Sequence, residues 1–124
     1  QTVSLTARHL EENGIPTVVV ANARDIVETC GVPRFLFSDF PLGSPCGEPD
    51  NVELQRSIVS QALDLLETAT APRTTVQTPF EWSKGDGWKA KVFTQDQPWQ
   101  TEEVKAAWLE KKALYRKLRE EGKV

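Results

Sequence analysis

The stretch FLFSDFPLGSPCGEPDN, residues 35–51, decides how the chain is expected to fold. It begins with an apolar run typical of a β-strand and passes at Ser38 and Asp39 into a loop rich in proline and glycine, which neither a helix nor a central strand accommodates. The loop ends at Asp50 and Asn51, where an amphipathic helix begins. Many α/β proteins bind ligands in such a place, outside the carboxyl ends of strands and against the free amides of a helix start. We therefore expect this loop to be the functional centre.

The residues before the loop predict two helices and two strands. Apolar residues four and three apart indicate a helix over 2–13, which Asn13 and Gly14 would end. The segment 15–20 is β-branched and apolar on both faces, which is typical of a strand buried between two helical layers. A helix over 23–29 would connect this strand to the second strand, over 34–37. Two apolar strands joined by a crossover of about a dozen residues are expected to be parallel and connected with a right hand.

The helix over 23–29 has its own expected details. Asn22 is a candidate for its cap, and Gly31 for its end. Its buried side would hold Ile26, Val27 and Cys30.

The residues after the loop predict the best helix of the chain, over 52–68. Its cap would be Asp50 or Asn51. An apolar stripe lies along this helix, and further apolar residues lie beside the stripe, so the apolar band is wide enough to be buried in a core. The stripe holds Leu54, Ile58, Ala62 and Leu65, and the residues beside it are Val59, Leu63 and Leu66.

The predicted fold class is α/β, a partial three-layer domain of Rossmann or flavodoxin-like type with a parallel sheet over residues 1–70. Residues 71–124 form a second region, an irregular Trp-rich arm with Trp82, Trp88 and Trp99 followed by a long helix over 101–121. We expect this region to pack on the domain or on a partner subunit. Residues 73–77 can supply a short edge strand. Since two strands do not make a stable sheet, further strands are expected from missing residues or from a partner.

Composition narrows the classes of function. The chain has 124 residues, a net charge of −3 and a pI near 5.2, so it offers no uniform basic face to a phosphate backbone, and nucleic acid is not an expected partner. It has no apolar run of the roughly 18 residues that a membrane span needs. Two cysteines cannot form a dense disulfide scaffold, which favours a reducing, cytoplasmic setting. The chain begins at Gln1 and contains no methionine, which indicates a processed chain, a fragment or a piece of something longer.

Two residues are candidates for chemistry. Cys46 precedes a helix start, where the helix dipole would stabilise a thiolate; it is a reactive thiol or simply a small loop residue. Asp39 follows a strand and is an acid/base or ligand-orienting residue, or a carboxylate that caps a turn. Gly43, Ser44 and Gly47 would present amides to an anion, or serve only the turns.

The remaining candidates favour structural roles. Cys30 reads as a buried structural thiol, and His9 as a solvated or packed residue. No metal site is indicated, because the chain has one histidine and its cysteines are sixteen residues apart without a CxxC spacing. The chain lacks Ser-His-Asp order, a GxxxxGK loop and a GxGxxG motif, so a self-contained hydrolase, kinase or dehydrogenase is poorly supported.

Residues 9–49 carry a family resemblance, most specifically in E-x-x-G-I-P-T at Glu11 to Thr17 and in P-L-G-x-P at Pro41 to Pro45. With the helix over 55–67 and the segment TTVQTPFEW, they resemble the C-terminal part of the selenoprotein B family, the substrate-specific subunits of glycine, sarcosine, betaine and D-proline reductases. The resemblance covers about residues 3–82. Its redox motif, a selenocysteine or cysteine with a second cysteine, would lie before the helix that starts near Thr2, hence outside this sequence or on another chain.

The resemblance implies an oxidoreductase that cleaves a C–N bond of a small amine or amino-acid-like substrate with a thiol or selenol supplied by an upstream or partner segment. The loop would be a wall of the active site, and its expected substrate-binding residues are Asp39, Phe40, Gly43, Ser44 and Gly47. Cys46 is a candidate for the second thiol that resolves the adduct. The chain would assemble into a homo- or hetero-oligomer with the chain that carries the redox motif. The alternative is a non-catalytic assembly domain whose loop and arm complete a partner's active site.

Overall fold

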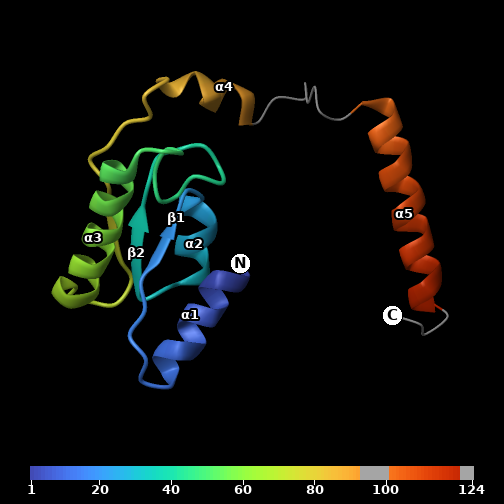
Figure 1. Ribbon diagram of the computed structural model, residues 1–124. Helices are drawn as coiled ribbons and strands as arrows, with labels where there is room; N and C mark the ends of the chain where they lie inside the picture. The colour runs from blue at the N-terminus through green and yellow to red at the C-terminus, as the bar shows by residue number, and fades with distance from the viewer. Residues whose placement is uncertain (93–100, 121–124) are drawn as a thin grey trace. The chain divides into compact units, whose positions relative to one another are not determined.

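The computed structural model describes residues 1–92 and 101–120 and divides the chain into two compact units, residues 1–89 and 90–124. The first unit is an α/β domain, and the second contains the long C-terminal helix (Figure 1). In chain order the elements are α1 (Thr2–Glu12), β1 (Val19–Ala21), α2 (Arg24–Cys30), β2 (Arg34–Phe37), α3 (Val52–Thr68), β3 (Thr74–Gln77), the 3-10 turn η1 (Asp86–Trp88), α4 (Lys89–Val92) and α5 (Glu102–Glu120).

The three strands form one parallel sheet in the order β1-β2-β3, which confirms the α/β class with a parallel sheet. The pairing of β3 with β2 confirms the edge strand that residues 73–77 predict. It also corrects the expectation that every further strand comes from outside these residues, because this chain supplies the third strand itself. The central strand β2 is therefore paired on both sides, and its hydrogen-bonding groups are satisfied within the domain.

Two hydrophobic clusters cover the two faces of the sheet. Phe35 points to one face, where α1 and α2 pack, and Leu36 points to the other, where α3 packs. Figure 1 shows α3 on one side of the strands and α1 and α2 on the other. Successive residues of a strand alternate between faces, so the continuous apolar run of β2 is the direct cause of the three layers.

The two crossovers lie on opposite faces of the sheet. The connection from β1 to β2 runs through α2 on one face, and the connection from β2 to β3 runs through α3 on the other. Each connection carries the chain to the next strand in the same direction across the sheet. Because the two connections lie on opposite faces, their crossovers have opposite handedness, so one of them is left-handed and departs from the usual rule. The loops that leave the carboxyl ends of β1 and β2 consequently diverge to opposite faces, which is the condition that opens a crevice in α/β sheets.

Helix α3 begins and ends as its sequence predicts. The Asn51 side chain accepts a hydrogen bond from the Leu54 backbone N–H at 3.1 Å, which confirms the cap. Ile58, the centre of the stripe, is fully buried. The band is narrower than expected, because Val59 and Leu63 lie mostly exposed, and one sheet face buries only one stripe of a helix.

Three expectations for the segment before the loop are wrong. The strand predicted over 15–20 forms only at Val19–Ala21, because β1 is an edge strand whose preceding residues turn back toward α1, and Ile15 is exposed. Asn22 does not cap α2, since Ala23 occupies the cap position and the Asn22 amide reaches across to β2 instead. On α2, Val27 is buried but Ile26 is exposed and Cys30 only half buried, because this short helix presents little more than one residue to the sheet.

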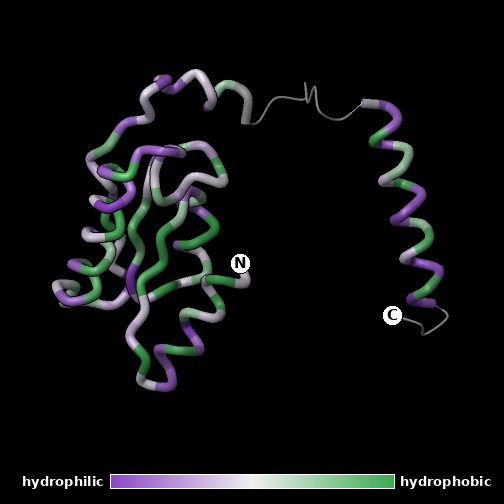
Figure 2. Tube along the Cα trace, in the orientation of Figure 1, coloured by the Kyte–Doolittle hydropathy of each residue, from purple (hydrophilic) through white to green (hydrophobic). Residues whose placement is uncertain are grey.

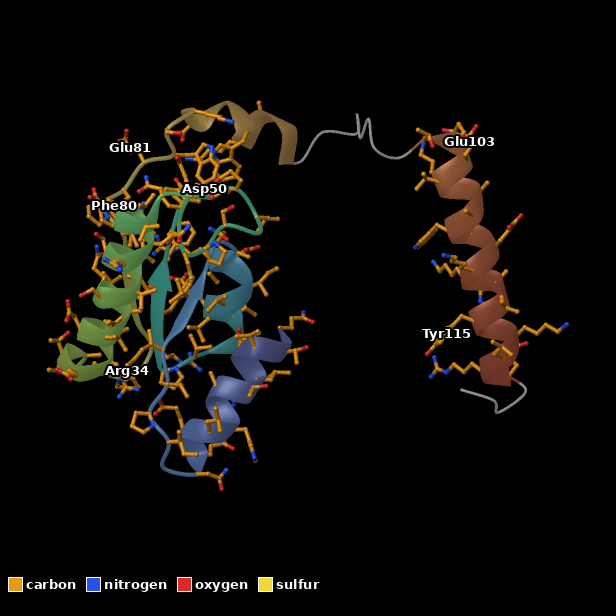
Figure 3. The ribbon with its side chains drawn as sticks, viewed as in Figure 1. Arg34, Asp50, Phe80, Glu81, Glu103 and Tyr115 are labelled. Carbon is orange, nitrogen blue, oxygen red and sulfur yellow. The ribbon has the colours of Figure 1, made fainter. Side chains whose placement is uncertain are left out.

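The Glu11 carboxylate connects three elements at the amino ends of the strands. It accepts hydrogen bonds from the Thr17 backbone N–H and hydroxyl, and from the Arg34 guanidinium at 2.7 Å. Partial burial raises the pKa of Glu11, but the Thr17 hydrogen bonds and the Arg34 charge outweigh burial, so the pKa is lowered overall. The E-x-x-G-I-P-T segment is therefore a structural lock that joins α1 to β1 and β2. Figure 3 shows Arg34 at the opposite end of the sheet from Phe80 and Asp50.

Helix α5 confirms the long C-terminal helix. Its residues are exposed except Leu118, which is half buried, and polar and apolar residues alternate along it (Figure 2). Within the described residues, no helix is both long and apolar enough to cross a membrane. The expectation for Trp99 lies outside the described residues.

Candidate functional site

The carboxyl ends of the strands gather polar residues at one edge of the sheet. The Asn22 amide, after β1, donates to the Ser38 carbonyl at 3.0 Å, and the Ser38 N–H donates to the Ala21 carbonyl at 3.1 Å. The Thr78 N–H, after β3, donates to the Phe37 carbonyl at 2.9 Å. These bonds extend the strand ladder past its end, so the loop that starts at Asp39 leaves from a fixed position.

Two hydroxyl groups at this edge are buried without a partner. Ser38 is fully buried and Thr78 nearly so, and within the described residues neither hydroxyl has a hydrogen-bond partner. A buried polar group without a partner costs about 1–3 kcal/mol, so such groups are uncommon in folded proteins and are often found where a function requires them. Two other buried side-chain atoms of the described residues also lack a partner, the Arg34 Nε at the amino ends of the strands and the Trp88 Nε1.

Lys89 forms the centre of a charge cluster that includes Asp39. The Lys89 ammonium donates to the Asp39 carboxylate at 2.7 Å and to the Asp86 carboxylate at 3.1 Å. The hydrogen bonds to Asp39 and Asp86 raise the pKa of Lys89 above its ordinary value, so Lys89 is a cation at neutral pH. The cluster is half exposed to solvent, and its charges are therefore accessible to a polar ligand.

A hollow of about 410 Å³ lies beside this cluster. Its walls come from the end of β3 and from the segment that follows, and they combine carboxylates with aromatic rings; the lining residues are Asp39, Gln77, Phe80, Glu81, Trp82, Gly85 and Asp86. Figure 3 labels Phe80 and Glu81 beyond the end of the sheet, with Asp50 close by in that view. Carboxylates together with aromatic faces are a chemistry that holds an organic cation such as an ammonium group.

The loop and the segment 80–89 hold each other in place. The Phe40 and Trp82 rings pack with centroids 5.4 Å apart, and the Glu48 carboxylate accepts a hydrogen bond from the Ser83 N–H at 2.6 Å. Phe40 is fully buried, so its ring is part of the core and supports Trp82.

The other residues singled out in the loop occupy turns. The Ser44 N–H donates to the Pro41 carbonyl at 3.1 Å, and the Gly47 N–H donates to the Ser44 carbonyl at 3.3 Å, so both amides serve the loop itself. Gly47 has a φ of 109°, and a Cβ there would lie 3.1 Å from Leu54, which explains the glycine by packing. Gly43 is exposed and open on all sides. The Cys46 side chain is exposed, and Cys30 is half buried; both are free thiols.

Sequence reasoning missed Lys89, Asp86 and the hydroxyl of Thr78. The only available signal was the position of Thr78, directly after a predicted edge strand of a parallel sheet, because the carboxyl ends of parallel strands share one edge. Lys89 lies fifty residues from Asp39 in an irregular stretch without periodicity, so no pattern connects the two. Among the described residues, no group of three histidine, cysteine or acidic side chains is placed to hold a metal ion.

The fold defines a class, an α/β domain with a parallel sheet that gathers polar and charged side chains at the carboxyl ends of its strands. Over 78 residues the chain is 33% identical to the D-proline reductase subunit gamma of Acetoanaerobium sticklandii, a match that covers 63% of this chain and 32% of that protein. The chain thus spans about a third of the length of this relative. No protein-family model matches the chain. No solved structure matches it either.

Proposed function

We propose that the chain forms part of a reductase that cleaves the C–N bond of a small amine or amino-acid-like substrate, and that its strand-end site binds this substrate. The observation that carries the proposal is the match to a D-proline reductase subunit. The chemistry of the site supports it: Lys89 offers a cation to a substrate carboxylate, and Glu81 and the Trp82 ring offer an anionic, aromatic surface to the substrate nitrogen.

The reaction needs a selenolate or thiolate that we assign to a segment or chain outside this sequence. This nucleophile attacks the carbon that carries the nitrogen; its bond to carbon forms as the C–N bond breaks, and the nitrogen leaves with the electron pair and takes up a proton. A second thiolate then attacks the sulfur or selenium of the adduct. The electron pair returns to carbon, which is protonated, and a disulfide or selenosulfide forms that an external dithiol reduces.

Two residues of this chain have proposed roles in these steps. Asp39, held by Lys89 at the strand end, orients the substrate and exchanges a proton with it. Cys46 is exposed in the same loop and is the candidate for the second thiol. Neither Cys46 nor Cys30 is assigned the role of the first nucleophile.

Binding to the chain tests the site directly. Saturation-transfer NMR with D-proline and with glycine betaine, under reducing conditions, measures whether either probe binds the 124-residue chain. We expect saturable binding that Lys89→Met and Asp39→Asn each weaken about tenfold, the effect of losing one charged contact. Lys84→Met is the matched control, an exposed lysine outside the cluster, and should bind as the wild type does. Equal binding by all variants, or no binding by the wild type, refutes the site.

A second function, assembly without catalysis, is favoured by one observation: α5 is amphipathic and exposed. Purification of the natural gene product under reducing, anaerobic conditions distinguishes the two. An upstream segment or a co-purifying chain with a cysteine or selenocysteine motif supports the reductase. Its absence, together with stable binding to another protein, supports the assembly role.

A further inference from the structure

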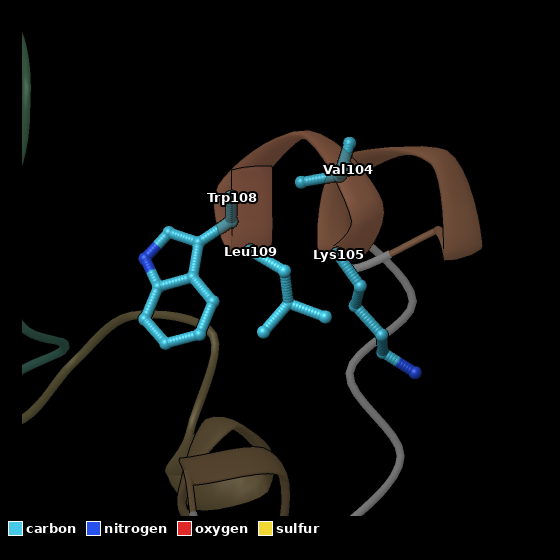
Figure 4. Close-up of a pocket in the computed structure, with 4 residues that line it drawn as sticks. All are labelled: Val104, Lys105, Trp108 and Leu109. Atoms are coloured by element: carbon cyan, nitrogen blue, oxygen red, sulfur yellow. The ribbon is translucent and has the colours of Figure 1, made fainter. Parts of the chain in front are cut away.

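Helix α5 carries an apolar stripe that is interrupted by Lys111. Its residues follow the three- and four-residue spacing that places side chains on one face of a helix; they are Val104, Ala107, Trp108, Leu114, Tyr115 and Leu118. Leu109 lies outside the stripe, although its side chain lines the same open hollow as Val104 and Trp108. Figure 3 labels Tyr115 near the end of α5, and Figure 4 shows Trp108 and Leu109 beside the first turns, where with Val104 and Lys105 they line an open hollow.

The stripe is exposed almost throughout. The side chains of Val104, Trp108, Leu114 and Tyr115 are each at least half exposed, between 51% and 60%. A helix of 19 residues is about 28 Å long and is marginally stable on its own in water, so it gains most of its stability by burying such a face. An apolar stripe of this length is typical of a surface that a partner helix covers.

The charges of α5 identify the partner. Residues 102–110 contain three glutamates and one lysine, a net charge of −2, whereas residues 111–120 contain five basic residues and one glutamate, a net charge of +4. A second α5 running in the opposite direction places the acidic end of each helix beside the basic end of the other, and it also pairs the helix dipoles favourably. Residues 1–89 have a net charge of −5, and a partner surface with a net negative charge would attract the basic half of α5 and repel the acidic half.

We propose that α5 is a dimerisation helix that pairs with α5 of a second copy of this chain in antiparallel orientation, through the stripe from Val104 to Leu118. Lys111 lies within the stripe, where its alkyl stem is buried and its ammonium reaches the rim next to Glu110 of the second copy. A lysine at such a position lowers the stability of the pair and restricts its register. The proposal does not depend on the proposed reductase function.

Sedimentation of the full chain tests the pairing. The protein concentration is varied across the micromolar range, and a reducing agent prevents disulfides through Cys30 and Cys46. We expect a reversible dimer. Leu114→Ala should weaken it about tenfold, as expected for truncation in the centre of an interface. Leu109→Ala is the matched control: it is the same change on the same helix, at 58% exposure against 57%, and it should change the dissociation constant less than about twofold. A chain that stays monomeric, or a control as damaging as Leu114→Ala, overturns the proposal.

Charge reversal and salt test the orientation. Glu102→Lys/Glu103→Lys and Lys117→Glu/Arg119→Glu should each weaken the homodimer, and an equal mixture of the two variants should restore it. For the wild type, added salt should weaken an antiparallel pair, whose charges attract. Salt that strengthens the dimer would indicate parallel helices with like charges together and would refute the antiparallel arrangement.

Discussion

Replacement of Glu11 tests the structural lock at the amino ends of the strands. Its carboxylate accepts from Thr17 and from Arg34, and the Glu11 and Arg34 side chains are only 23% and 20% exposed. A hydrogen bond to a charged group contributes about 1.5–3 kcal/mol, whereas an exposed ion pair contributes about 0.2–1 kcal/mol. Because Glu11→Ala removes the carboxylate and leaves the Thr17 N–H and the Arg34 guanidinium without it, we expect a loss of about 2–3 kcal/mol in unfolding free energy.

Two variants divide this loss by cause. Glu11→Gln keeps an acceptor for the Thr17 N–H and removes the charge, so it should cost about 1–1.5 kcal/mol. Glu28→Ala breaks the exposed ion pair between Arg24 and Glu28, in which the side chains are 53% and 41% exposed, respectively. This variant should cost less than about 0.5 kcal/mol. Urea unfolding at neutral pH, followed by circular dichroism, measures all three. A cost of Glu11→Ala no larger than that of Glu28→Ala would refute the lock.

The pH dependence of the unfolding free energy follows from the lowered pKa of Glu11. The folded-state pKa lies below the ordinary value of 4.5, so the contribution of this carboxylate to stability is fully present above pH 4.5 and is lost as the pH falls through the folded-state value. The difference in unfolding free energy between the wild type and Glu11→Gln should therefore be constant from about pH 6 to pH 8 and shrink toward pH 3. A difference that is independent of pH would show that the charge does not contribute.

Five further variants test the core and the loop by the same urea assay. Ile58→Ala should cost about 2–5 kcal/mol because the side chain is fully buried, whereas Val59→Ala, at 47% exposure, should cost less than about 1 kcal/mol; equal costs would refute the assignment of the buried stripe. Gly47→Ala should cost more unfolding free energy than Gly43→Ala. Both glycines have positive φ, but only at Gly47 would a Cβ contact Leu54. A larger cost for Gly43→Ala would refute the packing argument. Asn51→Ala should cost about 1 kcal/mol through loss of the cap, and an unchanged midpoint would refute it.

The sequence predicts those parts of the fold that depend on local rules. Periodicity and capping place α3 from Val52 to Thr68, and the strand of apolar residues before Ser38 is the centre of the sheet. The same rules fail where a long-range contact decides. Asn22 is a good cap by residue type, but its amide bonds the Ser38 carbonyl of the neighbouring strand, and this contact appears only once β1 and β2 are paired. Ile15 and the residues after it have strand propensity, yet their conformation is set by the bonds between Thr17 and Glu11.

The sequence predicts one member of the charge cluster, Asp39, but not its partner. Asp39 follows from its position after an apolar strand, because the carboxyl end of a strand in a parallel sheet is a fixed geometric location. Its partner Lys89 does not follow, since the segment from Phe80 to Lys89 has no period, and its contacts with the loop, such as those of Trp82 with Phe40 and of Ser83 with Glu48, are long-range. Composition identified this stretch as one with large aromatics, but the arrangement of these aromatics depends on the core formed by α3 and β2.

The two ends of the sheet differ in their polar contacts, and each end holds one of the two most specific segments of the resemblance. The E-x-x-G-I-P-T segment lies at the amino ends, where the Glu11 carboxylate accepts hydrogen bonds from Thr17 and Arg34, while the Arg34 Nε is buried without a partner among the described residues. At the carboxyl ends the Ser38 and Thr78 hydroxyls are buried without a partner among the described residues, and Lys89 is shared between two carboxylates beside a solvent-accessible hollow. Side chains that bind one another across α1, β1 and β2 stabilise the fold, whereas a half-exposed cation shared by two carboxylates is accessible to a polar ligand. Of the two most specific segments of the resemblance, E-x-x-G-I-P-T therefore supports the fold, whereas P-L-G-x-P lies in the loop that begins at Asp39, where we place the proposed site.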